Sequence, residues 1–488
     1  MSKKLLLICF SALFLLSIAM HFNVFKTDLI GKHLWRQSQT QLNIQQFTRY
    51  DYNILNPRHN CFNNKGSNIL RMEFPIMQWL IASVNKIFGE SILNTRICMF
   101  LFGFLGVIGM YLLILELFFN KVVALITAVA FNFSPVFYYY TMNPLPDVFA
   151  LSMGIFALAY FIKYKNSLEG KYMVISAIFM SVSILAKLPY ILFGALPATY
   201  FIQTLIKRKE GYQRKTKQIF ISYSLALLGP ILWYGWVMGE WGTTTIVGGI
   251  IKTPLPAERY WYILKHHLEV MWPRLLMGYP SLIIFFVGIF YILKNKKYLT
   301  SNFWLFGVMG LGLLGYFFFE ISMIDIVHDY YMMPFFLIFF VIIAYGITQI
   351  LDKNILYQSF LGFAIIAMPV HAYFTSTKLW SVQQSFYDPT LLNDREALRN
   401  IVPNDAKCIM INDYSGYIFP YLIDKLGYVF DHDHLPKEWV DDMIRNYDVK
   451  YMYSTTRVVD SQEDFQIFYD SLIYEKGAVK VFKLKVNQ

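Results

Sequence analysis

Charged residues are scarce in this chain and make up 15% of its 488 residues, whereas ordinary soluble proteins contain about 25%. Apolar and aromatic residues make up 56%, and the mean hydropathy is +0.42. A chain with so little polar surface aggregates in water unless its apolar residues are grouped into lipid-facing segments of about 20 residues each. The composition therefore excludes an ordinary soluble domain and predicts an α-helical polytopic membrane protein.

Cysteine is also rare, and its spacing carries no functional pattern. No glycine-rich phosphate loop is present either, and Asp413-Tyr-Ser-Gly416 has the pattern of an ordinary turn. The cysteines form no CxxC pair and no metal-ligand spacing, so we expect no disulfide framework and no zinc site. The four cysteines are Cys9, Cys61, Cys98 and Cys408.

Basic residues outnumber acidic ones, and the net charge is +11. In a soluble protein this excess would suggest a nucleic-acid partner. Here the basic residues lie in short loops between apolar runs, where they determine the orientation of a membrane protein. We therefore expect no nucleic-acid partner.

Apolar runs of membrane-spanning length recur along the first three quarters of the chain. The first run, residues 5–20, fits a cleavable signal peptide or an uncleaved anchor, and its weak cleavage site favours the anchor. An apolar stretch at 75–88 contains polar residues and fits an interfacial helix better than a span. Windows of about 19 residues predict eleven spans, at residues 4–24, 93–119, 122–140, 147–163, 172–187, 189–206, 218–238, 279–293, 302–319, 331–350 and 357–374.

The positive-inside rule orients these spans. With the N-terminus in the cytoplasm, the inward loops hold sixteen lysines and arginines, whereas the short outward turns at 141–146, 188 and 320–330 hold none. An odd number of spans then places the C-terminal tail outside the cytoplasm, together with two long loops, 25–92 and 239–278.

The tail, residues 375–488, differs in pattern from the preceding residues 1–374. Short apolar runs alternate with helix-like stretches, which predicts a small extracytoplasmic α/β domain with its own core. Asp431-His-Asp-His434 has residue types that bind metals, but a solvated turn explains this segment more simply. The predicted strands are 407–411, 428–430, 451–453 and 479–484, and the predicted helices are 417–425, 436–446 and 461–474.

The first outward loop opens with a run of polar residues at helical spacing. Residues 34–48 fit an interfacial helix with Trp35 as an anchor and Arg36, Gln37 and Gln45 on its polar face. Tryptophan and arginine are common membrane anchors as well, so composition alone leaves an anchoring role and a functional role open.

Several ionisable residues lie at the outward ends of the predicted spans. Glu73 precedes the 75–88 helix, and Asp147 opens a span, where a simple helix cap is the alternative interpretation. Lys187 lies between two apolar runs, where a lysine must be near the surface or paired with an anion. The turn at 320–330 adds Glu320, Asp325, His328 and Asp329. Their common side predicts a binding or catalytic face outside the cytoplasm.

These residues together resemble a known family, over about residues 5–375. The motifs are Trp35-Arg-Gln-x-x-Thr40, Glu73-Phe-Pro75, Pro146-Asp147, Lys187-Leu-Pro189 and His328-Asp-Tyr-Tyr331-x-x-Pro334. The set is similar to bacterial C-type (GT-C) glycosyltransferases related to protein O-mannosyltransferases and lipid A aminoarabinose transferases. The resemblance implies a cytoplasmic (inner) membrane enzyme that moves a sugar from a polyprenyl-phosphate donor to a glycan, lipid or protein acceptor, as in lipopolysaccharide modification.

Such a reaction needs a carboxylate base and a cation or metal to stabilise the departing lipid phosphate. The sequence has Trp35-Arg-Gln37 where the mannosyltransferases and aminoarabinose transferases carry an Asp-Glu pair, so the base must be another acid. The resemblance leaves the need for a divalent metal open. It implies Asp147, Glu73 and Asp51 as catalytic candidates, Arg36, Lys187 and His328 as phosphate contacts, and Trp35, Gln37, Asp329, Tyr330 and Tyr331 as substrate contacts.

Two other functions fit a polytopic protein with this outward face. A transporter or flippase of lipid-linked intermediates would carry charges at the bilayer midplane and often repeated halves, and the sequence shows neither. A noncatalytic scaffold would be indicated if Glu73, Asp147 and Lys187 lay far apart in the folded chain.

Overall fold

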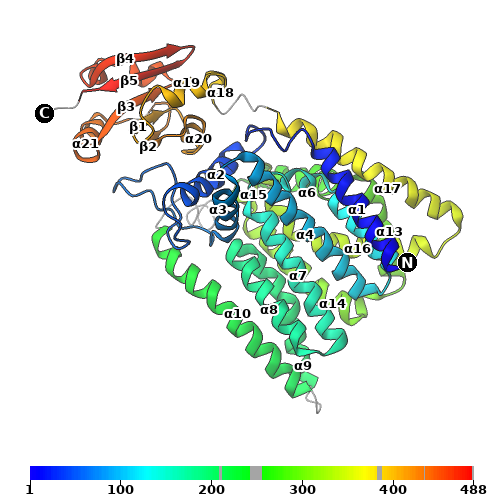
Figure 1. Ribbon diagram of the computed structural model, residues 1–488. Helices are drawn as coiled ribbons and strands as arrows, with labels where there is room; N and C mark the ends of the chain where they lie inside the picture. The colour runs from blue at the N-terminus through cyan, green and yellow to red at the C-terminus, as the bar shows by residue number, and fades with distance from the viewer. Residues whose placement is uncertain (208–211, 242–254, 382–386, 434, 486–488) are drawn as a thin grey trace. The chain divides into compact units, whose positions relative to one another are not determined.

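The computed structural model describes the chain apart from residues 208–211, 242–254, 382–386, 434 and 486–488 (Figure 1). Its described residues fold into two compact units. The helical unit consists of Met1–Lys26, Met72–Met77 and Thr95–Leu379, and the mixed unit consists of Thr27–Arg71, Gln78–Asn94 and Trp380–Gln488.

Long apolar helices build the helical unit. Within the described residues, eight helices are long and apolar enough to cross a membrane, or nine if a pair bent by 106° at Gly278 is one span. Two shorter apolar helices complete the set, and every one of the eleven predicted ranges is helical. The prediction of a polytopic α-helical fold is confirmed, and the number of spans stays a prediction.

The elements of this unit follow one another along the chain from the N-terminus to residue 380. They are α1 (Lys3–His21), α4 (Ile92–Phe118), α5 (Lys121–Asn132), α6 (Pro135–Tyr140), α7 (Pro146–Ser167), α8 (Gly170–Ala186), η1 (Leu188–Gly194), α9 (Ala195–Lys207), α10 (Tyr212–Trp241), α12 (Ala257–His266), the π-helix η2 (His267–Met277), α13 (Tyr279–Lys294), η3 (Lys297–Leu299), α14 (Ser301–Phe319), α15 (Ile321–Ile324), η4 (Asp329–Phe335), α16 (Phe336–Leu351), α17 (Ile355–Ser376) and η5 (Thr377–Trp380).

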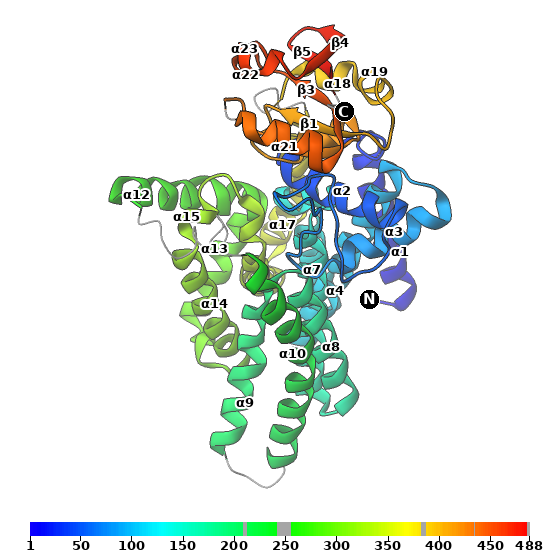
Figure 2. The same ribbon diagram turned by 90° about the vertical axis from the view of Figure 1, so that its left-hand side faces the viewer.

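Close helix packing holds this unit together. Helix α7 is largely buried and packs along α8, and α9 runs beside α10 (Figure 2). Glycines permit the contact between α13 and α16, because a Cβ atom on Gly288 or Gly346 would lie 2.3 Å from a backbone oxygen of the facing helix. Small residues are the usual means by which membrane helices approach so closely.

The mixed unit is built on a five-stranded sheet with the order β2-β1-β3-β5-β4. Strands β1, β2 and β3 are parallel, and β5 pairs antiparallel with β3 and β4. Alternate residues of β1 enter two separate hydrophobic clusters, so that helices cover both faces. The strands are β1 (Lys407–Ile411), β2 (Leu426–Phe430), β3 (Val449–Ser454), β4 (Tyr469–Lys476) and β5 (Val479–Leu484).

The helices of the tail confirm its predicted α/β character. Helix α20 lies on the face of the sheet that also meets α2, and α21 packs on the other face (Figure 1). The helices of this part, with the two in the first loop, are α2 (Leu34–Arg49), α3 (Ile76–Phe88), α18 (Pro389–Asn393), α19 (Arg395–Asn400), α20 (Ile418–Ile423), α21 (Lys437–Tyr447), α22 (Arg457–Asp460) and α23 (Glu463–Gln466).

One predicted element of the tail is wrong. The helix expected at 461–474 is replaced by the short α23 and by the first part of strand β4. Gly477, with φ +57°, opens a tight turn after Lys476 and allows β4 to fold back on β5. Pairing with β5 outweighs the local helical pattern of this segment.

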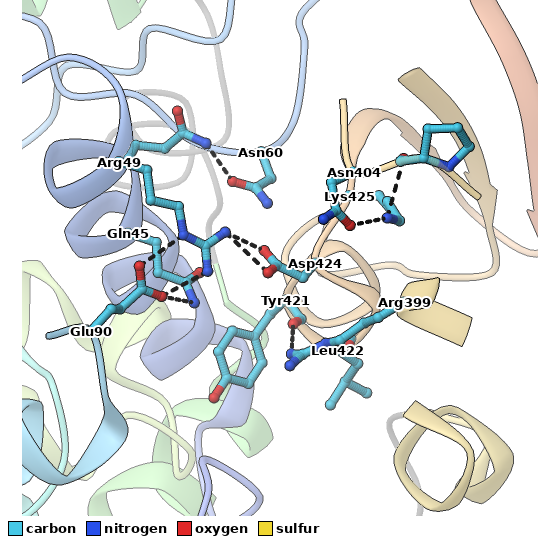
Figure 3. A network of polar contacts seen from close by, with 12 residues as sticks. Gln45, Arg49, Asn60, Glu90, Arg399, Asn404, Tyr421, Leu422, Asp424 and Lys425 are labelled. Atoms are coloured by element: carbon cyan, nitrogen blue, oxygen red, sulfur yellow. Dashed lines mark hydrogen bonds and ion pairs between the residues drawn. The ribbon is translucent and has the colours of Figure 1, made fainter. Parts of the chain in front are cut away.

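The first loop and the tail form one core. Gly427 of β2 donates its N–H to the Asn60 oxygen (2.9 Å) and accepts from the Phe62 N–H (2.8 Å), so that the loop extends the edge of the sheet. Arg49 of α2 forms ion pairs with Glu90 (2.7 Å) and Asp424 (2.8 Å), as Figure 3 shows. The contacts of Gly427 and Asp424 join the tail to a loop that lies more than 300 residues earlier in the sequence.

The prediction that 34–48 is helical is confirmed, but its expected exposed polar face is buried. Helix α2 packs against α20, and Leu34 and Leu42 enter the core of the tail. Gln37 donates to the Lys32 oxygen (2.7 Å) and Gln45 to Glu90 (3.2 Å), so both amide nitrogens find acceptors inside the unit.

Candidate active site

Asp147 is placed by the start of α7. The helix begins at Pro146, and its N-cap residue is Leu145, whose side chain makes no capping bond. Asp147 therefore lies in the first turn, where the helix dipole favours a carboxylate, and it is not the cap. Its side chain is 3% exposed.

Lys187 is placed by a break between two helices. It is the C-cap of α8 and has extended backbone angles, φ −161° and ψ 113°. Pro189 follows two residues later, at the start of η1, and has no backbone N–H with which to continue the hydrogen bonds of α8. The break directs the lysine toward Glu73, and their charged atoms lie 2.7 Å apart.

Glu73 lies on a short segment that is held at both sides. The Phe74 N–H donates to the Leu185 oxygen (2.9 Å), and the Trp233 indole donates to the Met72 oxygen (3.1 Å). The rings of Phe74 and Trp233 also meet edge to face, with centroids 5.0 Å apart. Glu73 is thereby fixed beside the end of α8.

The three charged residues form one constellation. Lys187 Nζ lies 2.7 Å from Glu73 and 3.8 Å from Asp147, and all three side chains are at most 12% exposed. Charges removed from water need partners, and one lysine between two carboxylates provides partial compensation. With all three ionised the group carries a net charge of −1. The sequence predicted these residues as candidates, and the structure brings them together.

The turn at 328–331 contributes aromatic rings. The Tyr331 ring centroid lies 5.4 Å from Lys187 Nζ, a cation–π distance. Tyr331 also contacts the rings of Tyr330 and His328, at 4.8 and 5.3 Å between centroids. Asp329 is buried and accepts a hydrogen bond from the Tyr140 hydroxyl. His328 Nδ1 lies 2.6 Å from the Met323 oxygen, which fixes the orientation of its ring.

Two tyrosines that the sequence gave no reason to select support this site. The Tyr190 hydroxyl donates to the Asp147 backbone oxygen (3.0 Å), and the Tyr234 hydroxyl donates to the Leu185 oxygen (3.1 Å). Tyr190 lies three residues after Lys187, at the end of the Lys-Leu-Pro motif, which is the one signal that could have identified it.

Four predicted site residues belong to the mixed unit. Arg36 donates to Gln39 within α2, and Trp35 packs against the core of the tail. Asp51 pairs with Arg58 (3.1 Å), and the backbone N–H of Asn53 lowers its pKa together with Arg58. A carboxyl group with a lowered pKa is a weak base at neutral pH. This setting gives Asp51 a structural role, and catalysis by Asp51 stays a prediction. The fourth of these residues is Gln37.

The 320–330 turn holds two further acids. Asp325 forms a two-oxygen ion pair with Arg259 (2.6 and 2.7 Å), and its backbone oxygen lies 2.7 Å from His267 Nε2. Glu320 is the N-cap residue of α15, and its side chain makes no capping hydrogen bond. Glu73 and Asp147 are the two acids whose ion-pair distances to Lys187 define the candidate site.

Metal-binding residue types gather at one place in the described part of the chain, where Asp431, His432 and Asp433 lie within reach of a common ion. His432 and Asp433 are exposed, as in the predicted solvated turn, and His434 lies outside the described residues. At the helical unit's site, the Lys187 ammonium occupies the space between the two carboxylates. Lysine supplies there the positive charge that a metal would supply.

The fold is similar to that of solved C-type glycosyltransferases. One of these structures is ArnT from Cupriavidus metallidurans bound to undecaprenyl phosphate, with TM-score 0.67, 13% identity and coverage of 99% of this chain and 98% of that chain. The archaeal oligosaccharyltransferase AglB from Archaeoglobus fulgidus, in complex with an inhibitory peptide and a dolichol-phosphate, has TM-score 0.55, 14% identity and coverage of 93% and 70%. Arabinofuranosyltransferase AftD from Mycobacteria has TM-score 0.57 and 11% identity, and the match covers 100% of this chain and 42% of that one.

A family model matches one part of the sequence. The family model of dolichyl-phosphate-mannose-protein mannosyltransferases matches residues 73–234, the segment that carries Glu73, Asp147 and Lys187. Among curated protein sequences, none matches the chain. The predicted resemblance to C-type glycosyltransferases is thereby confirmed.

Proposed function

We propose that this chain is a membrane glycosyltransferase that moves a sugar from a polyprenyl-phosphate donor to a hydroxyl-bearing acceptor on the outer face of a bacterial cytoplasmic membrane. The observation that carries the proposal is the constellation of Glu73, Asp147 and Lys187, each at an end of an apolar helix or beside one. A transfer reaction needs both a base and a cation, and a passive scaffold needs neither.

In this reaction Asp147 is the base. It accepts the proton of the acceptor hydroxyl as that oxygen attacks the anomeric carbon of the sugar. The bond between that carbon and the phosphate oxygen breaks, and the lipid phosphate leaves with the electron pair. The configuration at the anomeric carbon is thereby inverted. Asp147 suits this role better than Glu73, because Lys187 lies 3.8 Å from Asp147 and only 2.7 Å from Glu73. A closely paired carboxylate is the weaker base.

Lys187 stabilises the departing phosphate, and Glu73 positions Lys187. The ammonium is held by Glu73 on one side and by the Tyr331 ring on another. A cation fixed before the substrate arrives needs no reorganisation during the reaction, which is the main source of electrostatic stabilisation in enzymes.

Mass spectrometry of the surface glycans and glycolipids of a deletion strain tests the proposal. We expect one sugar to be missing and to return with the wild-type chain or with Asp352→Asn, an exposed acid on the loop after α16. Asp147→Asn should not restore it. If the chain is a flippase, the purified protein should not transfer sugar from a labelled polyprenyl-phosphate donor. Unchanged glycans in the deletion strain would contradict both functions.

A further inference from the structure

A cavity of about 530 Å³ lies at the end of the helical unit opposite to Glu73, Asp147 and Lys187. Helix α7 begins beside that constellation and ends near the cavity, where Lys165 in its last turn reaches Asn302 of the cavity wall (2.6 Å). Helix α16 likewise starts after the 328–331 turn and contributes Gln349, near its last residue, to the wall. The volume is typical of a small-molecule site, about 300–1,000 Å³.

The wall of this cavity has a polar part and an apolar part. Lys297, Asn302 and Gln349 supply nitrogen donors, and Phe303 and Phe306 supply aromatic surface. The wall therefore matches a molecule with a polar head and an apolar continuation.

The charge of the cavity has one sign. No aspartate or glutamate is among the residues that line it, and Lys297 is a lining residue. Lys294, the last residue of α13, and Lys296, in the connection to α14, are exposed and do not line the cavity. The nearby Glu116 lies 3.9 Å from Lys163 and is bonded to Asn166. An anion in the cavity would therefore meet the Lys297 ammonium without facing a carboxylate on the wall.

One hydrogen bond at the cavity wall uses the acceptor of an amide and leaves its donor available. Asn302 accepts the Lys165 ammonium on its amide oxygen, so its amide nitrogen is left to donate. Asn295 donates to the Tyr345 hydroxyl (3.0 Å), which fixes the opposite side of the wall. One ammonium with amide N–H groups is a donor set suited to phosphate oxygens.

We propose that this cavity binds the phosphate head group of an anionic membrane lipid, with the glycerol and the first part of the acyl chains against Phe303 and Phe306. A lipid is the occupant because the cavity lies at an end of apolar helices, where head groups of a leaflet are found, and because basic pockets between membrane helices bind such head groups. This site is separate from the transfer chemistry at the other end of α7.

Binding of short-chain phosphatidylglycerol to the purified full chain tests this assignment, with phosphatidylcholine and inorganic phosphate as comparison ligands. We expect saturable binding of phosphatidylglycerol, and an affinity about tenfold lower for Lys297→Gln, because one charge-assisted contact is lost. Lys296→Gln is the matched control, since it removes the same charge from the adjacent exposed residue, which does not line the cavity. Thr348→Phe fills the cavity without changing its charge, and this variant should no longer bind phosphatidylglycerol.

Three results would overturn the assignment. Equal binding of phosphatidylcholine would mean that the net negative charge of the head group is not recognised. Equal binding of inorganic phosphate would mean that the cavity is a site for a free anion. Equal losses in Lys296→Gln and Lys297→Gln would indicate general surface attraction. Size-exclusion elution of every variant establishes that it is folded, and if Lys297→Gln is not, Thr348→Phe decides.

Discussion

Lys187 contacts both acids of the candidate site at unequal distances. Its ammonium lies closer to Glu73 than to Asp147, and all three side chains are nearly buried. Removing one partner from a buried ion pair is costly, because the remaining charge is left without compensation. A substitution at this site can therefore reduce activity through loss of folding, so the stability of each variant is measured together with its activity.

Donor binding should depend on Lys187. Lys187→Ala should weaken the affinity for a labelled polyprenyl-phosphate sugar by roughly ten- to a hundredfold, since it loses a charge-assisted phosphate contact. The exposed Lys171 at the other end of α8 provides the control, because Lys171→Ala should bind normally.

The sequence alone suggests that Lys187→Ala leaves the protein folded, but the buried pair with Glu73 implies a loss of stability of about 3–5 kcal/mol. The double variant Lys187→Ala/Glu73→Gln removes both charges and should recover much of that stability without recovering donor affinity. If the Lys187 variants bind the labelled donor with wild-type affinity, the role of the lysine is structural.

Asp147→Asn should reduce turnover by at least about a hundredfold, within the range of general-base catalysis. Asparagine has nearly the same size, and Asp147 makes no N-cap, so the unfolding free energy should change by less than about 1 kcal/mol. Purified variants assayed with a labelled donor measure the first quantity, and thermal unfolding measures the second. A normally folded and fully active Asp147→Asn would transfer the role of base to Glu73.

Of the charged residues that the sequence predicted for the site, Glu73, Asp147 and Lys187 come together, whereas Arg36 and Asp51 belong to the mixed unit. The prediction of the three rests on their positions at the ends of apolar runs.

The sequence could not predict Tyr190, Trp233 or the pairing of Arg259 with Asp325. These contacts depend on how helices pack sideways, which the period of hydrophobic residues along one helix does not encode.

Among the individual elements, strand β2 contains one position where the spacing to the neighbouring strand leaves no room for a side chain. A Cβ atom on Gly427 would lie 1.8 Å from the Cys408 oxygen of β1, so only glycine fits between the two strands. The same residue pairs with the first loop through Asn60 and Phe62.

Gly427→Ala should therefore destabilise the mixed unit by about 1–3 kcal/mol or more, the usual cost of forcing extra atoms into a packed interior. Limited proteolysis of the purified chain should cut the tail faster in this variant. Ser471→Ala, at an exposed position of β4, should be cut at the wild-type rate. An unchanged cleavage rate in Gly427→Ala would mean that β1 and β2 separate easily.

The elements of the tail were predictable where local pattern and tertiary pairing agree, as in β1 and α21. The strand β4 was missed because its residues alternate poorly and its pairing partner β5 decides its conformation. The burial of α2 was missed for a related reason, since its cover is α20, almost 400 residues later in the chain.

At the scale of the whole molecule, orientation in the membrane is the prediction that supports a common outer face. Single cysteines at Gln213 and Lys450, both exposed, distinguish the two sides when treated with a membrane-impermeant thiol reagent. We expect the cysteine at Lys450, and a further single cysteine at Asp325, to be labelled from outside the cell. The cysteine at Gln213 should not be labelled, since the positive-inside rule places residues 207–217 in the cytoplasm. Labelling of the tail only after the membrane is opened would contradict the odd number of spans.

The joint core of the first loop and the tail also constrains the order in which the protein is made. Arg49 and Asp424 are 375 residues apart in the sequence, and a ribosome adding about 5–20 residues per second needs roughly 20–75 s to cover that distance. Throughout this interval the loop has left the ribosome while its sheet and most of its hydrophobic core do not yet exist. The polar, glutamine-rich surface of α2 suits such a wait, because it keeps an early segment soluble until its late partner arrives.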